Sequence, residues 1–216
     1  MFFEIYDRVV ALAEKYSGKA KKVTPSEFTN IIRRQFAGAD FLFRTVKDPA
    51  VELDMIVIAG SYDPMSDSLG DPSIEICLCY NPDQKYYFTQ LIDWEKLCFD
   101  FAECVCHEGI HQLQYRKHRS QKEFTNKLED LDPAYDPDYL SNDLEIDAYG
   151  FSIAAESVVY GQHFTQCSMY KVYSDTFDNQ PTIMAKLEEQ ILKYLKYLEI
   201  TYEKSSTRVA TRIRYR

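Results

Sequence analysis

The sequence is poor in residues that break a chain or cross-link it. Among its 216 residues there are seven Gly, eight Pro and six Cys. So little Gly and Pro excludes a collagen-like or linker-dominated chain. The Cys residues are too sparse for a disulfide scaffold and form no C-x-x-C pair, so we expect reduced, buried thiols rather than a Cys-based metal site. No apolar run is long enough to cross a bilayer, and the N-terminus becomes charged at once, unlike a signal peptide. These absences predict a cytoplasmic protein with no membrane partner.

Positive charge is scarce as well. The chain has 25 Lys and Arg against 34 Asp and Glu, which gives a formal net charge of −9. Binding to nucleic acid depends on clustered Lys and Arg, so nucleic acid is not the expected partner of the protein body. The exception is the basic tail, residues 204–216, which holds five Lys or Arg and no acid. We expect a solvated tail, with contact to an acidic partner as the alternative.

The hydrophobic pattern predicts an α+β fold. Helical periodicity extends over residues 2–16, 25–37, 89–118, 142–161 and from 181 onward. Thr24, Pro25 and Glu27 form a capping box at the start of the second helix. Residues 51–59 and 74–80 read as antiparallel strands around an exposed loop at 61–73. We therefore expect a single domain of helices with a small, mostly antiparallel sheet.

One motif carries chemistry. Residues 107–111 read His-Glu-Gly-Ile-His, the pattern H-E-x-x-H, on a predicted helix. Residues four apart share one helical face, so His107 and His111 can bind the same ion. Glu108 can then reach a metal-bound water and act as a general base. The alternative is two His residues without a metal, but the apolar approach to the motif predicts a buried helix, where unpaired polar side chains are costly.

A third ligand is needed, because catalytic zinc usually has three protein ligands and a water. His118 lies seven residues beyond His111, about 10 Å along a continuing helix and too far for the same ion. Metzincins turn the chain at a Gly and add a third His, but here these positions hold Gln114 and Lys117. We therefore reject the metzincin pattern and expect His118 to be a solvated residue at the helix end.

The two predicted motif helices resemble the gluzincin type of zincin metallopeptidases. The H-E-x-x-H motif is followed by Glu145-Ile146-Asp147-Ala148, which is similar to the E-x-x-A segment of Ste24/HtpX-like and ImmA/IrrE-like peptidases. The chain also resembles uncharacterised phage proteins with H-E-x-x-H-x-x-Q, in which Gln114 is the Gln. The resemblance implies a zincin-like domain over residues 1–203 that holds Zn²⁺ through His107, His111 and Glu145.

The same resemblance implies an activity. This activity is zinc-dependent hydrolysis of a peptide bond in a protein or peptide substrate, with Glu108 as general base. The expected location is the cytoplasm or, for a phage protein, the host cytoplasm or the virion. Tyr149, Tyr160 and His163 are the candidates for oxyanion or substrate contacts. The alternatives are a non-catalytic interaction or virion-associated protein that retains the metal site, and a regulatory peptidase with one dedicated target.

Four further expectations concern the surroundings of this site. Asp143 and Asp147 are rivals to Glu145, but they point in other directions around the helix. Tyr149 stands where the resembled families often have Asp or Asn. Strand 74–80 is a candidate edge strand for peptide binding by strand addition, with a core strand as the alternative. The acidic loop 129–141 is a candidate lid.

Overall fold

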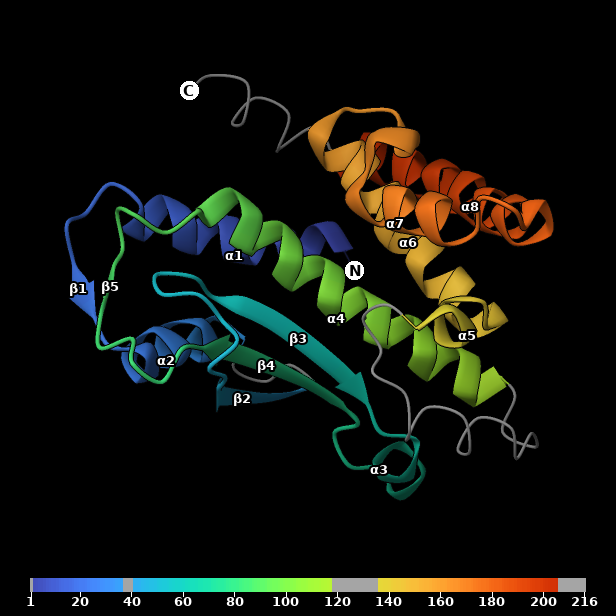
Figure 1. The fold of residues 1–216 in the computed structure, drawn as a ribbon. Helices are drawn as coiled ribbons and strands as arrows, with labels where there is room; N and C mark the ends of the chain where they lie inside the picture. Colours follow the sequence, from blue (N-terminus) through green and yellow to red (C-terminus); the bar gives the residue numbers. More distant parts are fainter. Residues whose placement is uncertain (1, 37–40, 118–135, 206–216) are drawn as a thin grey trace. The chain divides into compact units, whose positions relative to one another are not determined.

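The computed structural model describes residues 2–36, 41–117 and 136–205. It contains helices together with small sheets, so the predicted α+β class is confirmed (Figure 1). The chain divides into two compact units, Met1–Leu113 and Gln114–Arg216. The division falls inside one continuous helix, α4 (Trp94–Lys117).

The first unit is built around a three-stranded sheet. Its strands are β2 (Leu42–Lys47), β3 (Val57–Tyr62) and β4 (Ile74–Tyr80), in the order β2-β4-β3. β4 is parallel to β2 and antiparallel to β3, as predicted for its pairing with β3. Of the two alternatives for strand 74–80, the edge strand is wrong and the core strand is confirmed, because β4 is paired on both sides. A separate antiparallel pair joins β1 (Lys22–Val23) to β5 (Tyr87–Phe88).

Strand β3 and its connection to β4 both differ from the prediction. β3 begins at Val57 rather than 51, because the preceding residues turn, with Asp54 in a left-handed conformation at φ 66°. The expected exposed loop contains a short helix, α3 (Pro64–Leu69), with Asp63 as its N-cap. Asp67 and Ser73 of this segment are buried rather than exposed.

Helices pack against the sheet and against one another. They are α1 (Phe2–Tyr16), α2 (Pro25–Gln35) and α4 (Trp94–Lys117). Thr45 Oγ1 of β2 donates to Thr29 Oγ1 of α2 at 3.1 Å, and the Phe2 ring of α1 lies 6.4 Å from the Phe99 ring of α4. The capping box predicted at Thr24 and Glu27 is present at the start of α2. The Phe43 ring of β2 stacks on Phe101 of α4 at 5.6 Å between centroids. α4 is thereby held against the sheet.

The second unit is helical in the described residues. It contains α5 (Pro137–Leu140), α6 (Asp143–Tyr160), the 3-10 helix η2 (Phe164–Gln166), α7 (Ser168–Thr176) and α8 (Pro181–Ser205). Asn142 caps α6, and Gly161 ends it in a left-handed conformation, as the sequence predicts. α6 and α8 pack closely at Gly150, where an added Cβ would lie 2.6 Å from Gln190 Cβ. α7 was not expected from the sequence.

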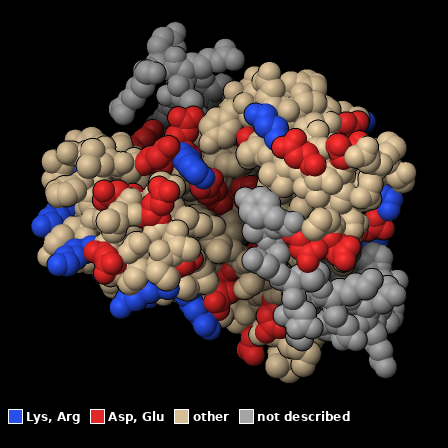
Figure 2. Space-filling view, in the orientation of Figure 1, with Lys and Arg blue, Asp and Glu red and all other residues tan. Residues whose placement is uncertain are grey.

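The remaining predictions about the whole chain have different outcomes. No helix in the described part of the chain has the length and apolar character needed to span a bilayer. On the face drawn in Figure 2, Lys and Arg are interspersed with Asp and Glu. His118, residues 129–135 of the acidic loop and residues 206–216 of the basic tail lie outside the described residues. The proposed domain limits stay a prediction.

Candidate metal centre

The first two candidate ligands lie on a segment of α4 that is buried on all sides. All residues from Cys104 to His111 are buried. His107 and His111 keep only 8% and 6% of their surface exposed. Their Nε2 atoms are 3.2 Å apart, as expected for two side chains one helical turn apart. Two nitrogens that bind one tetrahedral Zn²⁺ at about 2.05 Å are about 3.3 Å apart, so the pair already has the spacing that such an ion needs.

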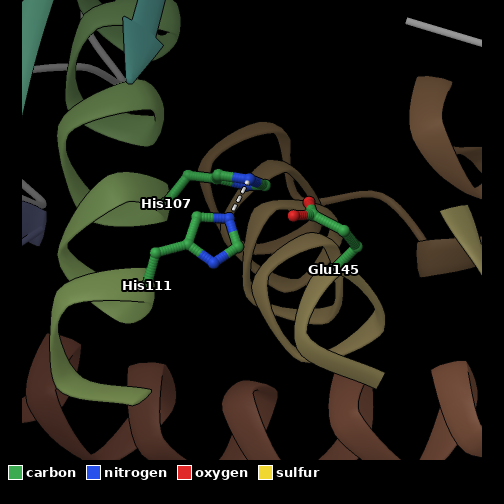
Figure 3. A group of neighbouring side chains, drawn as sticks. All are labelled: His107, His111 and Glu145. Carbon is green, nitrogen blue, oxygen red and sulfur yellow. Dashed lines mark hydrogen bonds between the residues drawn. The ribbon is translucent and has the colours of Figure 1, made fainter. Parts of the chain in front are cut away.

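The third candidate ligand comes from α6. Glu145 lies in the first turn, which the Asn142 cap begins, and only 1% of its surface is exposed. Ligand atoms of His107, His111 and Glu145 all lie within 4.8 Å of one another. Figure 3 shows both imidazole rings extending from α4 toward the Glu145 carboxylate. These three buried side chains could hold a metal ion, and their two nitrogen donors and one oxygen donor fit the ligand preference of zinc.

The two rival acids of α6 have other partners. Asp143 is exposed and accepts a hydrogen bond from Lys186 Nζ at 2.7 Å. Asp147 accepts from Gln114 Nε2 at 3.0 Å and from Lys193 Nζ at 2.6 Å. These contacts hold the pKa of the Asp147 carboxyl below its ordinary value despite partial burial, which opposes them. Of the three acids, Glu145 is the one that joins the His pair.

A further carboxylate lies behind His107. Glu103 Oε1 is 3.9 Å from His107 Nδ1, one turn earlier on α4. This distance is longer than a hydrogen bond, so the contact is electrostatic. A carboxylate near the second ring nitrogen is a common companion of a metal-binding His, because it favours a proton on that nitrogen and leaves the other for the metal. Glu103 was not predicted from the sequence, although its spacing of four residues from His107 was a usable signal.

Glu108, the predicted general base, is buried against strand β3. A Cβ built on Gly60 would lie 2.8 Å from Glu108 Cγ and 3.0 Å from Glu108 Oε1. The same Cβ would lie 2.6 Å from Cys104 Sγ. Burial raises the pKa of the Cys104 thiol, and the Glu103 and Glu108 carboxylates raise it further, so the sulfur is a neutral packing atom. Gly60 was not predicted to have a role, because no local signal in the sequence indicates this contact.

The three candidates for oxyanion contacts are spread along the second unit. Tyr149 lies one turn beyond Glu145 on α6, with its ring 5.8 Å from that of Tyr173. Tyr160 ends the same helix, about 22 Å further along its axis than Glu145. His163 caps η2 and contacts Thr165 Oγ1 at 2.9 Å. Tyr149 is therefore the one that α6 places nearest to Glu145 along the chain.

Comparison of the chain with protein-family models, curated protein sequences and solved structures finds no match. The family resemblance therefore depends on the motif residues alone. What is established is a group of three buried side chains, His107, His111 and Glu145, that could hold a metal ion.

Proposed function

We propose that the protein is a zinc-dependent metallopeptidase. The observation that carries the proposal is the buried group of His107, His111 and Glu145, with ligand atoms within 4.8 Å of one another. A general base candidate, Glu108, directly follows the first of these ligands in the chain. Two His and one Glu are the ligand set of several zinc peptidases, and such sites leave the fourth position to water and substrate.

Zinc in this position would polarise the scissile carbonyl and make water a better nucleophile near neutral pH. Glu108 accepts a proton from that water and delivers it to the leaving amine. Glu108 keeps only 8% of its surface exposed and lies against Gly60, so that its carboxylate is held in place and shielded from bulk solvent. Tyr149 is the preferred candidate for the oxyanion donor, since it lies on the helix face next to Glu145.

A peptide substrate is favoured by the strand that passes Glu108. β3 pairs with β4 on one side, and no described strand pairs with its other side. An extended peptide could add to this edge by main-chain hydrogen bonds. Gly60, within β3, lies against Glu108, so a peptide on this strand would run close to the general base. β3 thereby takes the peptide-binding role first predicted for strand 74–80.

The test combines metal analysis with peptide cleavage. The full chain is reconstituted with Zn²⁺, its metal content is measured, and cleavage of a broad fluorogenic peptide library is followed. We expect about one zinc per chain, Glu108→Gln to keep zinc and lose about 10²–10⁴-fold in rate, and His111→Ala to lose the metal. Asp143→Asn is the matched control, since it removes a nearby acid of α6 that is not a proposed ligand.

Two outcomes would contradict the proposal. A reconstituted wild-type protein without zinc overturns the metal site itself. Zinc that is bound by the wild type and by Glu108→Gln, with no cleavage by either, overturns the peptidase and favours a non-catalytic interaction protein that holds a metal.

A further inference from the structure

Asp147 is the point at which three helices meet through polar contacts. It lies two residues beyond Glu145 on α6, about 200° around the helix axis. From α4, Gln114 Nε2 donates to Asp147 Oδ2 at 3.0 Å. From α8, Lys193 Nζ and Tyr194 OH donate to Asp147 Oδ1 at 2.6 and 3.1 Å. Both carboxylate oxygens are therefore engaged, each by a different helix.

Gln114 makes a second contact with the same turn of α6. Its Nε2 also donates to the main-chain carbonyl oxygen of Leu144 at 3.1 Å. One amide group thus binds α6 immediately before Glu145 and again two residues after it. On its own helix, Gln114 follows His111 by three residues and lies on the same side of α4. The side chain that binds α6 is therefore carried by the same rigid helix as the His pair.

We propose that Gln114 and Asp147 are positioning residues that set the distance from Glu145 to His107 and His111. In this arrangement Lys193 and Tyr194 hold the Asp147 carboxylate in the orientation that Gln114 binds. The inference rests on the proposed metal site, but it does not require the site to hydrolyse peptides. It also assigns a role to the Gln of the H-E-x-x-H-x-x-Q pattern.

The energetics favour an orienting role over a stabilising one. The Lys193 side chain is 53% exposed, and ion pairs with such exposure contribute little to stability. Groups that orient metal ligands through one intervening contact nevertheless change metal affinity by about 10–100-fold when removed. We therefore expect loss of the Gln114–Asp147 contact to weaken metal binding more than it lowers the melting temperature.

The experiment measures the dissociation constant for Zn²⁺ in the full chain by competition with a chromogenic chelator. The variants are Gln114→Ala, Asp147→Ala and the double variant, with the melting temperature of each metal-free protein measured alongside. Each single variant is expected to bind Zn²⁺ about 10–100-fold more weakly than wild type. The double variant is expected to bind no more weakly than the worse single variant, because both changes break the same contact. Asp147→Asn replaces Asp147→Ala if the latter does not fold.

The matched control is Asp143→Asn. Asp143 pairs with Lys186 of α8 at 2.7 Å and belongs to the first turn of α6, and among the described residues no hydrogen bond or ion pair joins its side chain to α4. We expect its zinc affinity to stay within about twofold of wild type, because an exposed pair contributes little. Visible absorption of the Co²⁺-loaded proteins supplies a second measurement: the spectrum should change in Gln114→Ala and Asp147→Ala and not in Asp143→Asn.

The outcomes separate this inference from the peptidase proposal. Wild-type zinc affinity in Gln114→Ala and Asp147→Ala overturns the positioning role, even for an active peptidase. Equal weakening in Asp143→Asn overturns it too, since that result would reflect general loosening of α6. A wild type that binds zinc without cleaving peptides overturns the peptidase proposal alone. In that case, a zinc affinity that is reduced only in the Gln114 and Asp147 variants still supports the positioning role.

Discussion

Replacing Gly60 by Ala adds a methyl group between strand β3 and helix α4. The new Cβ would lie 2.6 Å from Cys104 Sγ and 2.8 Å from Glu108 Cγ. Unstrained heavy-atom contacts of this kind lie at about 3.5–4.0 Å, so each neighbour must move by about 1 Å. Gly60 has no left-handed backbone conformation, since the Gly residues with positive φ are Gly70 and Gly161. The cost therefore comes from the contacts and not from backbone strain.

The expected stability loss for Gly60→Ala is about 1–3 kcal/mol, the usual cost of overpacking a core. The rate of peptide hydrolysis should fall by more than the fraction of folded protein does, because a displacement of about 1 Å in a catalytic group can reduce the rate about 100-fold. Adding Cys104→Ala removes the sulfur contact and should recover part of the stability. It should not recover the rate, since the contact with Glu108 remains.

The assays are urea unfolding at constant m value and initial rates of peptide cleavage. Gly18→Ala is the matched control, because an added Cβ there meets no atom within 4 Å. Its expected effect is zero or a gain of about 0.4–1 kcal/mol through the unfolded state. A Gly60→Ala protein with the wild-type unfolding midpoint and the wild-type rate would refute the packing of Glu108 against β3.

Two further predictions concern stability. Gly150→Ala places a Cβ 2.6 Å from Gln190 Cβ and 3.3 Å from the Gln190 carbonyl carbon, so α6 and α8 must separate. We expect the free energy of unfolding to fall by about 1–3 kcal/mol, measured by thermal unfolding. An unchanged melting temperature would contradict the close approach of the two helices. Burial raises the pKa of the Cys98 and Cys106 thiols from about 9 to about 12. Between these values the unfolded chain loses the thiol protons and the folded protein keeps them, so stability should fall as the pH rises above 9, and Cys98→Ala should flatten the urea-midpoint profile.

Local chemistry explains which parts of the fold were predictable. The start of α2 and both ends of α6 follow from capping residues within one turn, Thr24 and Glu27 in one helix and Asn142 and Gly161 in the other. Strand β4 was predicted with its observed limits, because its sequence has the apolar pattern of a strand. In the structure, most of its buried residues alternate with less buried ones. These signals are contained in the segment itself.

The missed elements depend on partners that are distant in sequence. β2 has mostly exposed side chains, so it lacks the pattern of a buried strand, and its register comes from pairing with β4 about 30 residues later. Because β2 was missed, β4 was predicted as a candidate edge strand. α7 has a similar cause: Tyr173 is fully buried, and its hydroxyl donates to the Leu140 carbonyl at 2.9 Å, a contact with no local signal.

The candidate metal centre also combines residues predictable from local sequence with a residue that depends on distant partners. His107 and His111 are brought together by helix geometry alone, so their spacing in the sequence was sufficient to predict their proximity. Three acids occupy the start of α6, and Glu145 was predicted among them through the resemblance of residues 145–148 to the E-x-x-A segment. In the structure, Lys186 and Lys193 of α8 pair with Asp143 and Asp147, while Glu145 lies with the His pair. Gln114 then binds the Asp147 that Lys193 holds. α8, a helix with no predicted role at the site, thus binds both rival acids. Lys193→Ala is expected to weaken metal binding through Asp147, whereas Lys186→Ala, which affects only Asp143, is not.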